Sequence, residues 1–182
     1  MKMMMLFLAA LLVSVAASGQ EFAISTNLVD YANLGTLNVE ASYGVAQHWS
    51  VDAGAKYNPF SFGNGGQVKQ NRQRSLSAGA RYWPWHIYSG WWLAASLRWQ
   101  EYNAGGLDNP ETAEGDRFGS AVKGGYSYMV SRHFNLNIGM GVWAGRDAFT
   151  VYSCPTCGRV VDHGAKFFVL PSDFIMSLSY IF

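Results

Sequence analysis

The sequence predicts an all-β fold, an eight-stranded antiparallel up-and-down transmembrane β-barrel. Three observations predict it: apolar and polar residues alternate with a period of two in eight segments, charged residues make up only 14% of the chain, and aromatic residues make up 15%. Ordinary soluble domains carry roughly 25% charged residues. A period of two gives each segment one apolar and one polar face, which is the geometry of a β-strand.

Residues 1–19 have the pattern of a signal peptide. Lys2 supplies a positive charge, residues 3–15 form an apolar run, and residues 16–19 are the small residues at which a signal peptidase cleaves. We expect cleavage after Gly19, which leaves residues 20–182 as one outer-membrane β-barrel domain. No apolar run of about 18 residues remains in it, so a helical membrane protein is not expected.

The clearest strand is segment 37–45, in which Val39 and Tyr43 belong to the apolar face and Glu40 and Ser42 to the polar face. An even number of such strands can close into a barrel without leaving an edge. The eight expected strands lie at 22–28, 37–45, 49–58, 75–82, 93–100, 122–128, 134–142 and 174–182.

The charges within the strands fall on the same face as glycine and serine. They are Glu40, Asp52, Lys56, Arg81, Arg98 and Lys123. Side chains fill the interior of an eight-stranded barrel, so we expect these six to form a paired polar core in preference to an ion or proton path. A soluble, lipocalin-like barrel is the alternative fold. The low charge content and the final Tyr180-Ile181-Phe182 favour the inverted arrangement, with the apolar face outward.

The connections between the expected strands alternate in length. Segments 46–48, 84–89 and 131–133 are short, and segments 59–71, 103–117 and 146–166 are long. In outer-membrane barrels short turns face the periplasm and long loops face outside. The first long loop is basic and the second is acidic, so their charges are either solvated or paired across the mouth. Aromatic residues are expected in two girdles, with Tyr102 and Phe168 in the outer one.

Cys154 and Cys157 lie in the third long loop, in the order Cys154-Pro155-Thr156-Cys157-Gly158. Cys-x-x-Cys is half of a zinc site, and His163 is the nearest further ligand, with Asp147 or Asp162 as the fourth. The sequence has no second cysteine pair. A local Cys154–Cys157 disulfide, formed in an oxidising exterior, is therefore the preferred interpretation, with free thiols as a third alternative. No cofactor is expected.

No catalytic constellation is visible in the sequence. Three of the four histidines, His48, His86 and His133, fall at short turns, and only His163 falls in a long loop. We therefore expect no enzymatic activity. A formal net charge of +1 gives no indication of a nucleic-acid partner. The expected partners are outer-membrane lipid and lipopolysaccharide, whose phosphates basic loops can meet.

Several short motifs together resemble a Bacteroidota family of small outer-membrane β-barrels known only as a domain of unknown function, the one with a Cys-Pro-x-Cys-Gly loop before the last strand. The motifs are Asn33-Leu34-Gly35, Tyr57-Asn58-Pro59-Phe60, Ala80-Arg81-Tyr82-Trp83, Tyr102-Asn103-Ala104-Gly105-Gly106 and the cysteine loop. One departure is Leu170-Pro171-Ser172-Asp173, where the family usually has Gly-Pro-Thr-Lys. The resemblance implies an outer-membrane location, no established catalysis, and association with fimbrial or surface-assembly components.

The sequence as a whole predicts a non-enzymatic barrel in the outer membrane of a Gram-negative bacterium. Its extracellular loops would be displayed in support of a fimbrial or surface assembly. A narrow channel and a lipid-modifying outer-membrane enzyme are the alternatives.

Overall fold

The computed structural model describes residues 22–63, 69–105, 111–154 and 157–182, without the side chains of Cys157 and Asp173. The expected signal peptide, residues 1–19, lies outside the described residues. Within the described ranges, no helix is long and apolar enough to cross a membrane.

The described chain is all-β apart from one short helix, α2 (Leu28–Ala32). The strands are β1 (Phe22–Asn27), β2 (Leu37–Ala46), β3 (Trp49–Asn58), β4 (Ser61–Phe62), β5 (Lys69–Tyr82), β6 (Gly90–Gly105), β7 (Thr112–Met129), β8 (Phe134–Cys154) and β9 (Cys157–Ile181).

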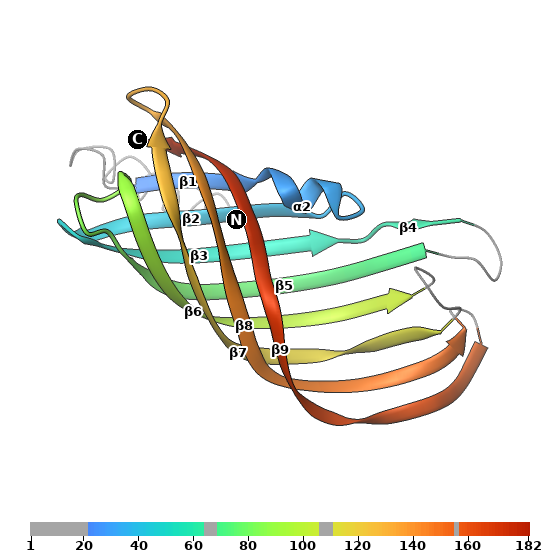
Figure 1. Ribbon diagram of the computed structural model, residues 1–182. Coiled ribbons are helices and arrows are strands. Elements are labelled where there is room, and N and C mark those ends of the chain that lie inside the picture. The colour runs from blue at the N-terminus through green and yellow to red at the C-terminus, as the bar shows by residue number, and fades with distance from the viewer. Residues whose placement is uncertain (1–21, 64–68, 106–110, 155–156) are drawn as a thin grey trace, which may run out of the picture.

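Eight of these strands form a closed antiparallel ring, as the sequence predicts. Neighbours in the chain pair with each other, β3 pairs with β5 across β4, and β1 pairs with β9 to close the ring. The two-residue strand β4 pairs only with β5 in the described structure and stands outside the ring. Figure 1 shows the strands following one another around the ring, with β9 returning to β1.

The two ends of the ring differ in construction. The near end carries the short turns 46–49, 82–90 and 129–134 together with Phe22 and Phe182, whose backbones are joined by a 2.9 Å hydrogen bond from Phe182 N to Phe22 O. The far end carries the tips of the β6–β7 and β8–β9 hairpins. Among the described residues, five register pairs, from Ala23–Ile181 to Asn27–Ser177, join β1 to β9.

Asn27 ends the pairing of β1 with β9. Its side-chain amide donates to the Phe174 carbonyl at 3.1 Å, and its side-chain oxygen accepts the Met176 amide proton at 3.0 Å. The same oxygen accepts from Val29 N and caps helix α2. The chain thus leaves the sheet into α2, and β9 sweeps away from β1 and α2 toward the far end (Figure 1).

The prediction that segments 103–117 and 146–166 are long loops is wrong. Strands β6 and β7 continue to Gly105 and Thr112, and β8 and β9 continue to Cys154 and Cys157. Alternation persists there, with charged residues such as Asp116 and Arg146 on the exposed face. These segments are rich in polar residues because one face of each strand is exposed to water, and this composition led to their prediction as loops.

Burial in the ring is inverted relative to a water-soluble sheet. Large apolar side chains are exposed along every strand of the ring, and serine, asparagine, arginine and lysine are buried. Two small clusters of apolar residues also lie inside. One is Ala23, Trp83, Tyr88, Trp92, Ala94 and Ile181, and the other is Ala121, Trp143 and Phe168.

Two aromatic residues lie on the opposite face from the one expected. Tyr102 and Phe168, predicted for an outer girdle, are only 6% and 7% exposed. Both pack against the guanidinium of Arg117 inside the ring. An aromatic side chain fits either face of such a strand, and here the contact with the half-buried Arg117 favours the inner one.

Candidate functional site: the polar interior

The near end of the ring is closed by the β5–β6 turn, which folds inward. Trp83 is 0% exposed, and its indole nitrogen donates to Ser50 Oγ at 3.1 Å. Tyr88 is buried beside it, with the two ring centroids 5.7 Å apart, and its hydroxyl donates to the Ser42 carbonyl at 3.2 Å. The Tyr88 backbone has a φ of 62°, in the left-handed region that side chains disfavour.

Hydrogen bonds to neighbouring segments hold Tyr88 in this disfavoured backbone conformation. Its carbonyl accepts hydrogen bonds from Asn135 Nδ2 and from Ser127 Oγ, and the neighbouring Ile87 N donates to the Gln47 carbonyl. Polar groups from β7, β8 and the β2–β3 turn therefore fix this turn inside the ring. We call Trp83, Tyr88 and Trp92 together the near-end plug.

Arg81 lies directly on the near-end plug. Its Nη2 is 2.7 Å from Glu40 Oε1, and its Nε is 3.3 Å from Asp52 Oδ2. Its guanidinium carbon is 4.6 Å from the ring centroid of Trp92. One cation thus joins two carboxylates on β2 and β3 to an aromatic ring on β6, which satisfies charges that would be costly to bury alone.

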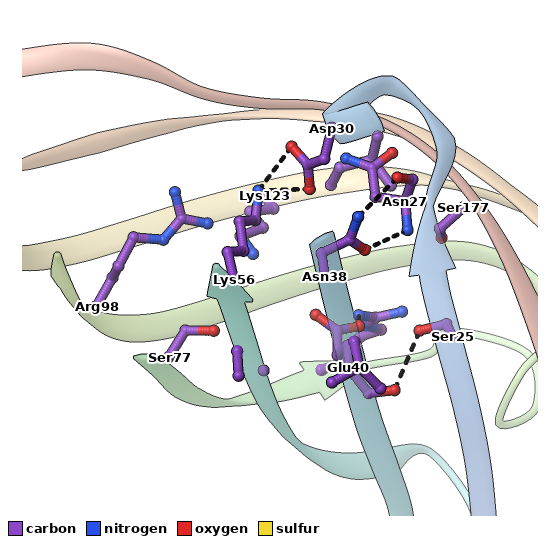
Figure 2. Close-up of a pocket in the computed structure, with 15 residues that line it drawn as sticks. Ser25, Asn27, Asp30, Asn38, Glu40, Lys56, Ser77, Arg98, Lys123 and Ser177 are labelled. Atoms are coloured by element: carbon purple, nitrogen blue, oxygen red, sulfur yellow. Dashed lines mark hydrogen bonds and ion pairs between the residues drawn. The ribbon is translucent and has the colours of Figure 1, made fainter. Parts of the chain in front are cut away.

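Lys56 pairs with a carboxylate that sequence reasoning missed. Its ammonium is 2.8 Å and 3.0 Å from the two carboxylate oxygens of Asp30. Figure 2 marks these contacts with dashed lines. Asp30 comes from helix α2, which a search for period-two segments does not detect. A single acidic residue within the apolar run Leu28-Val29-Asp30-Tyr31 was the available signal.

The sequence-predicted interior residues meet around one small cavity. The cavity has a volume of about 50 Å³ and is lined by groups from β1, α2, β2, β3, β5, β6, β7 and β9. Glu40, Lys56, Arg98 and Lys123 contribute to its wall (Figure 2). Arg81 contributes as well. Asp52 lines a smaller adjoining space with Glu40 and Arg81. A cavity of this size holds a few water molecules and no larger ligand.

A second aromatic layer lies toward the far end. Arg98 is placed over Trp143 at 5.2 Å, and Trp143 meets Phe168 edge to face at 4.7 Å. Beyond them, Arg117 lies over Tyr102 at 3.8 Å. Arginine side chains, buried at Arg81 and Arg98 and half-buried at Arg117, therefore alternate with aromatic rings inside the ring of strands. Each pair adds an attraction that grows when water is excluded.

Asp147 anchors the outermost pair of this stack. Its carboxylate is buried and is 3.1 Å from Arg117 Nε and 3.0 Å from the Tyr102 hydroxyl, which donates to it. Burial, followed by the hydrogen bond to Asp147, raises the pKa of Tyr102 to about 12. Sequence reasoning placed Asp147 and Arg117 in loops, so it missed their ion pair and considered Asp147 only as a possible zinc ligand.

A larger basin opens beyond Tyr102 at the far end. Its volume is about 810 Å³, and its walls come from β3, β5, β6, β7, β8 and β9. Charged side chains along its rim pair with each other, for example Arg74 Nε with Glu101 Oε2 at 2.6 Å. Of the two alternatives for these loop charges, solvated or paired across the mouth, Arg74 follows neither, because its partner Glu101 lies on the adjacent strand β6. Glu114 accepts from Tyr152 and Asn103 in the same way.

The cysteines lie at the tip of the β8–β9 hairpin. Cys154 and Cys157 are register partners, and Cys154 is disulfide-bonded. His163 is the register partner of Thr150, four residues along β8 from Cys154, which is roughly 13 Å in a strand. The structure therefore does not bring His163 to Cys154. Within the described residues, no three His, Cys, Asp or Glu side chains form a metal-binding group.

The near-end histidines bond to the backbone. His48 Nδ1 is 2.9 Å from the Trp83 carbonyl, and His133 Nδ1 is 2.9 Å from the Ile181 carbonyl. Each histidine thus connects a turn to a neighbouring segment of backbone, so both imidazoles have a structural role.

The family model described as "Protein of unknown function (DUF3575)" matches residues 3–182. The chain belongs to this family. No curated protein matches the sequence. The description of the DUF3575 family names no activity, so the function of this member has to be argued from its own residues.

Proposed function

We propose that this DUF3575 protein is a transmembrane β-barrel of the outer membrane of a Gram-negative bacterium, of Bacteroidota type. In this proposal it is not an enzyme, and it displays rigid extracellular hairpins that support a fimbrial or surface assembly. The observation that carries the proposal is the inverted ring, with apolar side chains exposed outside and paired charges buried inside. In water such an exterior would drive aggregation, whereas in lipid it is the stable arrangement.

The exposed apolar residues form a belt with two limits. At the near end the belt begins at the aromatic residues Tyr43, Trp49, Tyr82, Trp91 and Tyr180. At the far side it ends at the exposed charges Arg74, Glu101, Asp116 and Arg146. On β5 these limits are Tyr82 and Arg74, a span that suits the roughly 9–11 residues that a tilted membrane strand needs. The near end would then face the periplasm.

The near-end plug argues against the channel alternative. Trp83, Tyr88 and Trp92 fill the ring beside Arg81, and the central cavity is only about 50 Å³. An eight-stranded barrel has room for side chains but not for an open pore once they are packed. The interior is therefore a stabilising core in this proposal, and recognition is left to the far end.

The far end supplies the display surface. Hairpins β6–β7 and β8–β9 extend past the charged limit of the belt as continuous strands. A hairpin built on a rigid ring presents its side chains in a fixed arrangement, as binding surfaces require. Exposed Lys69 and Arg72 at the same end are suited to lipopolysaccharide phosphates.

The first test is heat-modifiability. The mature protein, purified in detergent, should migrate differently on a gel before and after boiling, with β-type circular dichroism in the unboiled sample. A water-soluble protein without a shift would overturn the membrane proposal. In planar bilayers we expect no steady conductance, and lipid A from a deletion strain should have the same mass spectrum as lipid A from wild type. Conductance would support the channel instead, and a changed spectrum would support the enzyme.

A further inference from the structure

The strand β9 has an open edge over much of its length. It pairs with β8 along its whole course but with β1 only from Ser177 to Ile181. Among the residues that the structure describes, no strand pairs with the other side of β9 between 158 and 174. An open edge presents backbone donors and acceptors that can template a further strand.

The outer part of this edge lies beyond the apolar belt. Phe167 is the register partner of Arg146, one of the charges that limit the belt, and residues 158–166 continue outward from there. Val160 and Val161 in this segment are exposed. Lipid does not account for apolar side chains at this level, so the segment has the properties of a protein-binding edge.

We propose that the edge of β9 at residues 158–167 binds an extended strand of a partner protein, which adds to the sheet antiparallel to β9 and directs alternate side chains into the basin. The basin lies along this edge, since His163 and Gly164 form part of its wall. This inference names the kind of partner that the proposed display role requires. The observations behind it are the open edge of β9 and the basin, and both are present whether or not the ring lies in a membrane.

The inner face of the edge specifies the chemistry of the partner strand. Asp162, Gly164 and Lys166 are register partners of Val151, Phe149 and Asp147, so their side chains share the inner face of the sheet with them. Lys166 carries a positive charge 4.4 Å from the Phe149 ring centroid, and Asp162 carries a negative charge four residues earlier. Cross-strand neighbours of opposite charge stabilise a pair.

Gly164 lies between these two charges and leaves space at the edge. The nearest atom to a Cβ built there is Phe149 Cζ at 3.8 Å. A large aromatic side chain opposite this glycine would cover it and pack against Phe149. Read in its own direction, the antiparallel partner strand is therefore acidic opposite Lys166, aromatic opposite Gly164 and basic opposite Asp162, with one residue between each.

The test uses two synthetic peptides that differ only in charge order. The matching peptide is Ser-Glu-Val-Phe-Val-Lys-Ser, the reversed peptide is Ser-Lys-Val-Phe-Val-Glu-Ser, and both carry a fluorophore for anisotropy measurements on the full chain in detergent. We expect the matching peptide to bind roughly tenfold more tightly than the reversed one, since two charge pairs change sign. N-methylation of alternate peptide nitrogens should abolish binding, because it removes the ladder hydrogen bonds.

The decisive variant carries Asp162→Lys together with Lys166→Asp. It should reverse the preference and bind the second peptide more tightly. The control variant, Arg74→Glu with Glu101→Arg, exchanges an exposed ion pair on β5 and β6 and should keep the original preference. Equal binding of both peptides, full binding of the N-methylated peptide, or no binding to a chain that shows the gel shift would overturn this inference. The last result would leave the membrane proposal standing.

Discussion

The guanidinium of Arg81 lies over the indole of Trp92, with its carbon 4.6 Å from the ring centroid, while its nitrogens contact Glu40 and Asp52. A single side chain therefore connects the carboxylates of Glu40 on β2 and Asp52 on β3 to the near-end plug. The same combination recurs toward the far end, where Arg117 bonds to Asp147 and lies over Tyr102. Cation, carboxylate and ring form the repeating unit of the interior.

The first prediction concerns Arg81. In Arg81→Met, Glu40 and Asp52 keep their places without their shared cation, and breaking such a buried pair typically costs about 3–5 kcal/mol. We expect the free energy of unfolding in urea, measured in detergent or lipid vesicles, to fall by that order. The control is Arg74→Met, whose side chain is 64% exposed beside Glu101, and little or no change is expected there. Equal losses in the free energy of unfolding for the two substitutions would show that Arg81 contributes no more to stability than an exposed arginine.

The second prediction concerns the space around Trp92. A Cβ added at Gly125 would lie 2.2 Å from the Ile138 carbonyl oxygen and 2.6 Å from Trp92 Cζ2, whereas one added at the adjacent Gly124 would lie 3.1 Å from the flexible end of Leu93. Gly125→Ala should therefore destabilise the protein by about 1–3 kcal/mol and shift the tryptophan fluorescence. Gly124→Ala should have a smaller effect on both the stability and the tryptophan fluorescence. A neutral Gly125→Ala would mean that Trp92 does not pack against this glycine.

The alternation of residues was sufficient to predict much of the fold. Eight strands, their antiparallel order and the face that carries Arg81 and Lys123 follow from a period of two, because adjacent side chains in a strand must point to opposite sides. The pairing of strands in chain order follows at the three short turns, which leave no alternative neighbour, and elsewhere from the tendency of consecutive strands to be adjacent.

The parts that sequence reasoning missed share a physical cause. Asp30 lies in a five-residue helix, where the period of two is lost, and its role depends on a contact with Lys56 that is distant in sequence. Asp147 and Arg117 lie where a strand leaves the apolar belt, so polar residues occupy both faces and the alternation becomes hard to read. The early end of β1 at Asn27, and with it the open edge of β9, depends on side-chain hydrogen bonds that no composition rule reveals.

The third prediction is a pH dependence from Tyr102. An unfolded tyrosine has its ordinary pKa of 10.0, and the folded protein raises that of Tyr102 to about 12. The folded state thus holds this proton more tightly, so its contribution to stability is complete below pH 10.0 and is lost as the pH rises toward about 12. The urea midpoint should fall over this range, and Tyr102→Phe should remove part of the fall. Tyr128→Phe, an exposed tyrosine on β7, is the control and should leave the fall intact. An unchanged profile in Tyr102→Phe would contradict the assignment.

The fourth prediction separates a lipid-facing exterior from a water-facing one. Val122 is 63% exposed near the middle of the apolar belt on β7, and Val160 is exposed on β9 beyond the charges that limit the belt. If lipid surrounds the belt, Val122→Arg should lower the free energy of unfolding in vesicles by about 2–4 kcal/mol, while Val160→Arg should lower it by at most about 1 kcal/mol. If water surrounds the ring, an arginine at either exposed position is tolerated equally. Two similar small effects would therefore overturn the membrane proposal, because only a hydrocarbon surrounding makes the depth of the charge matter.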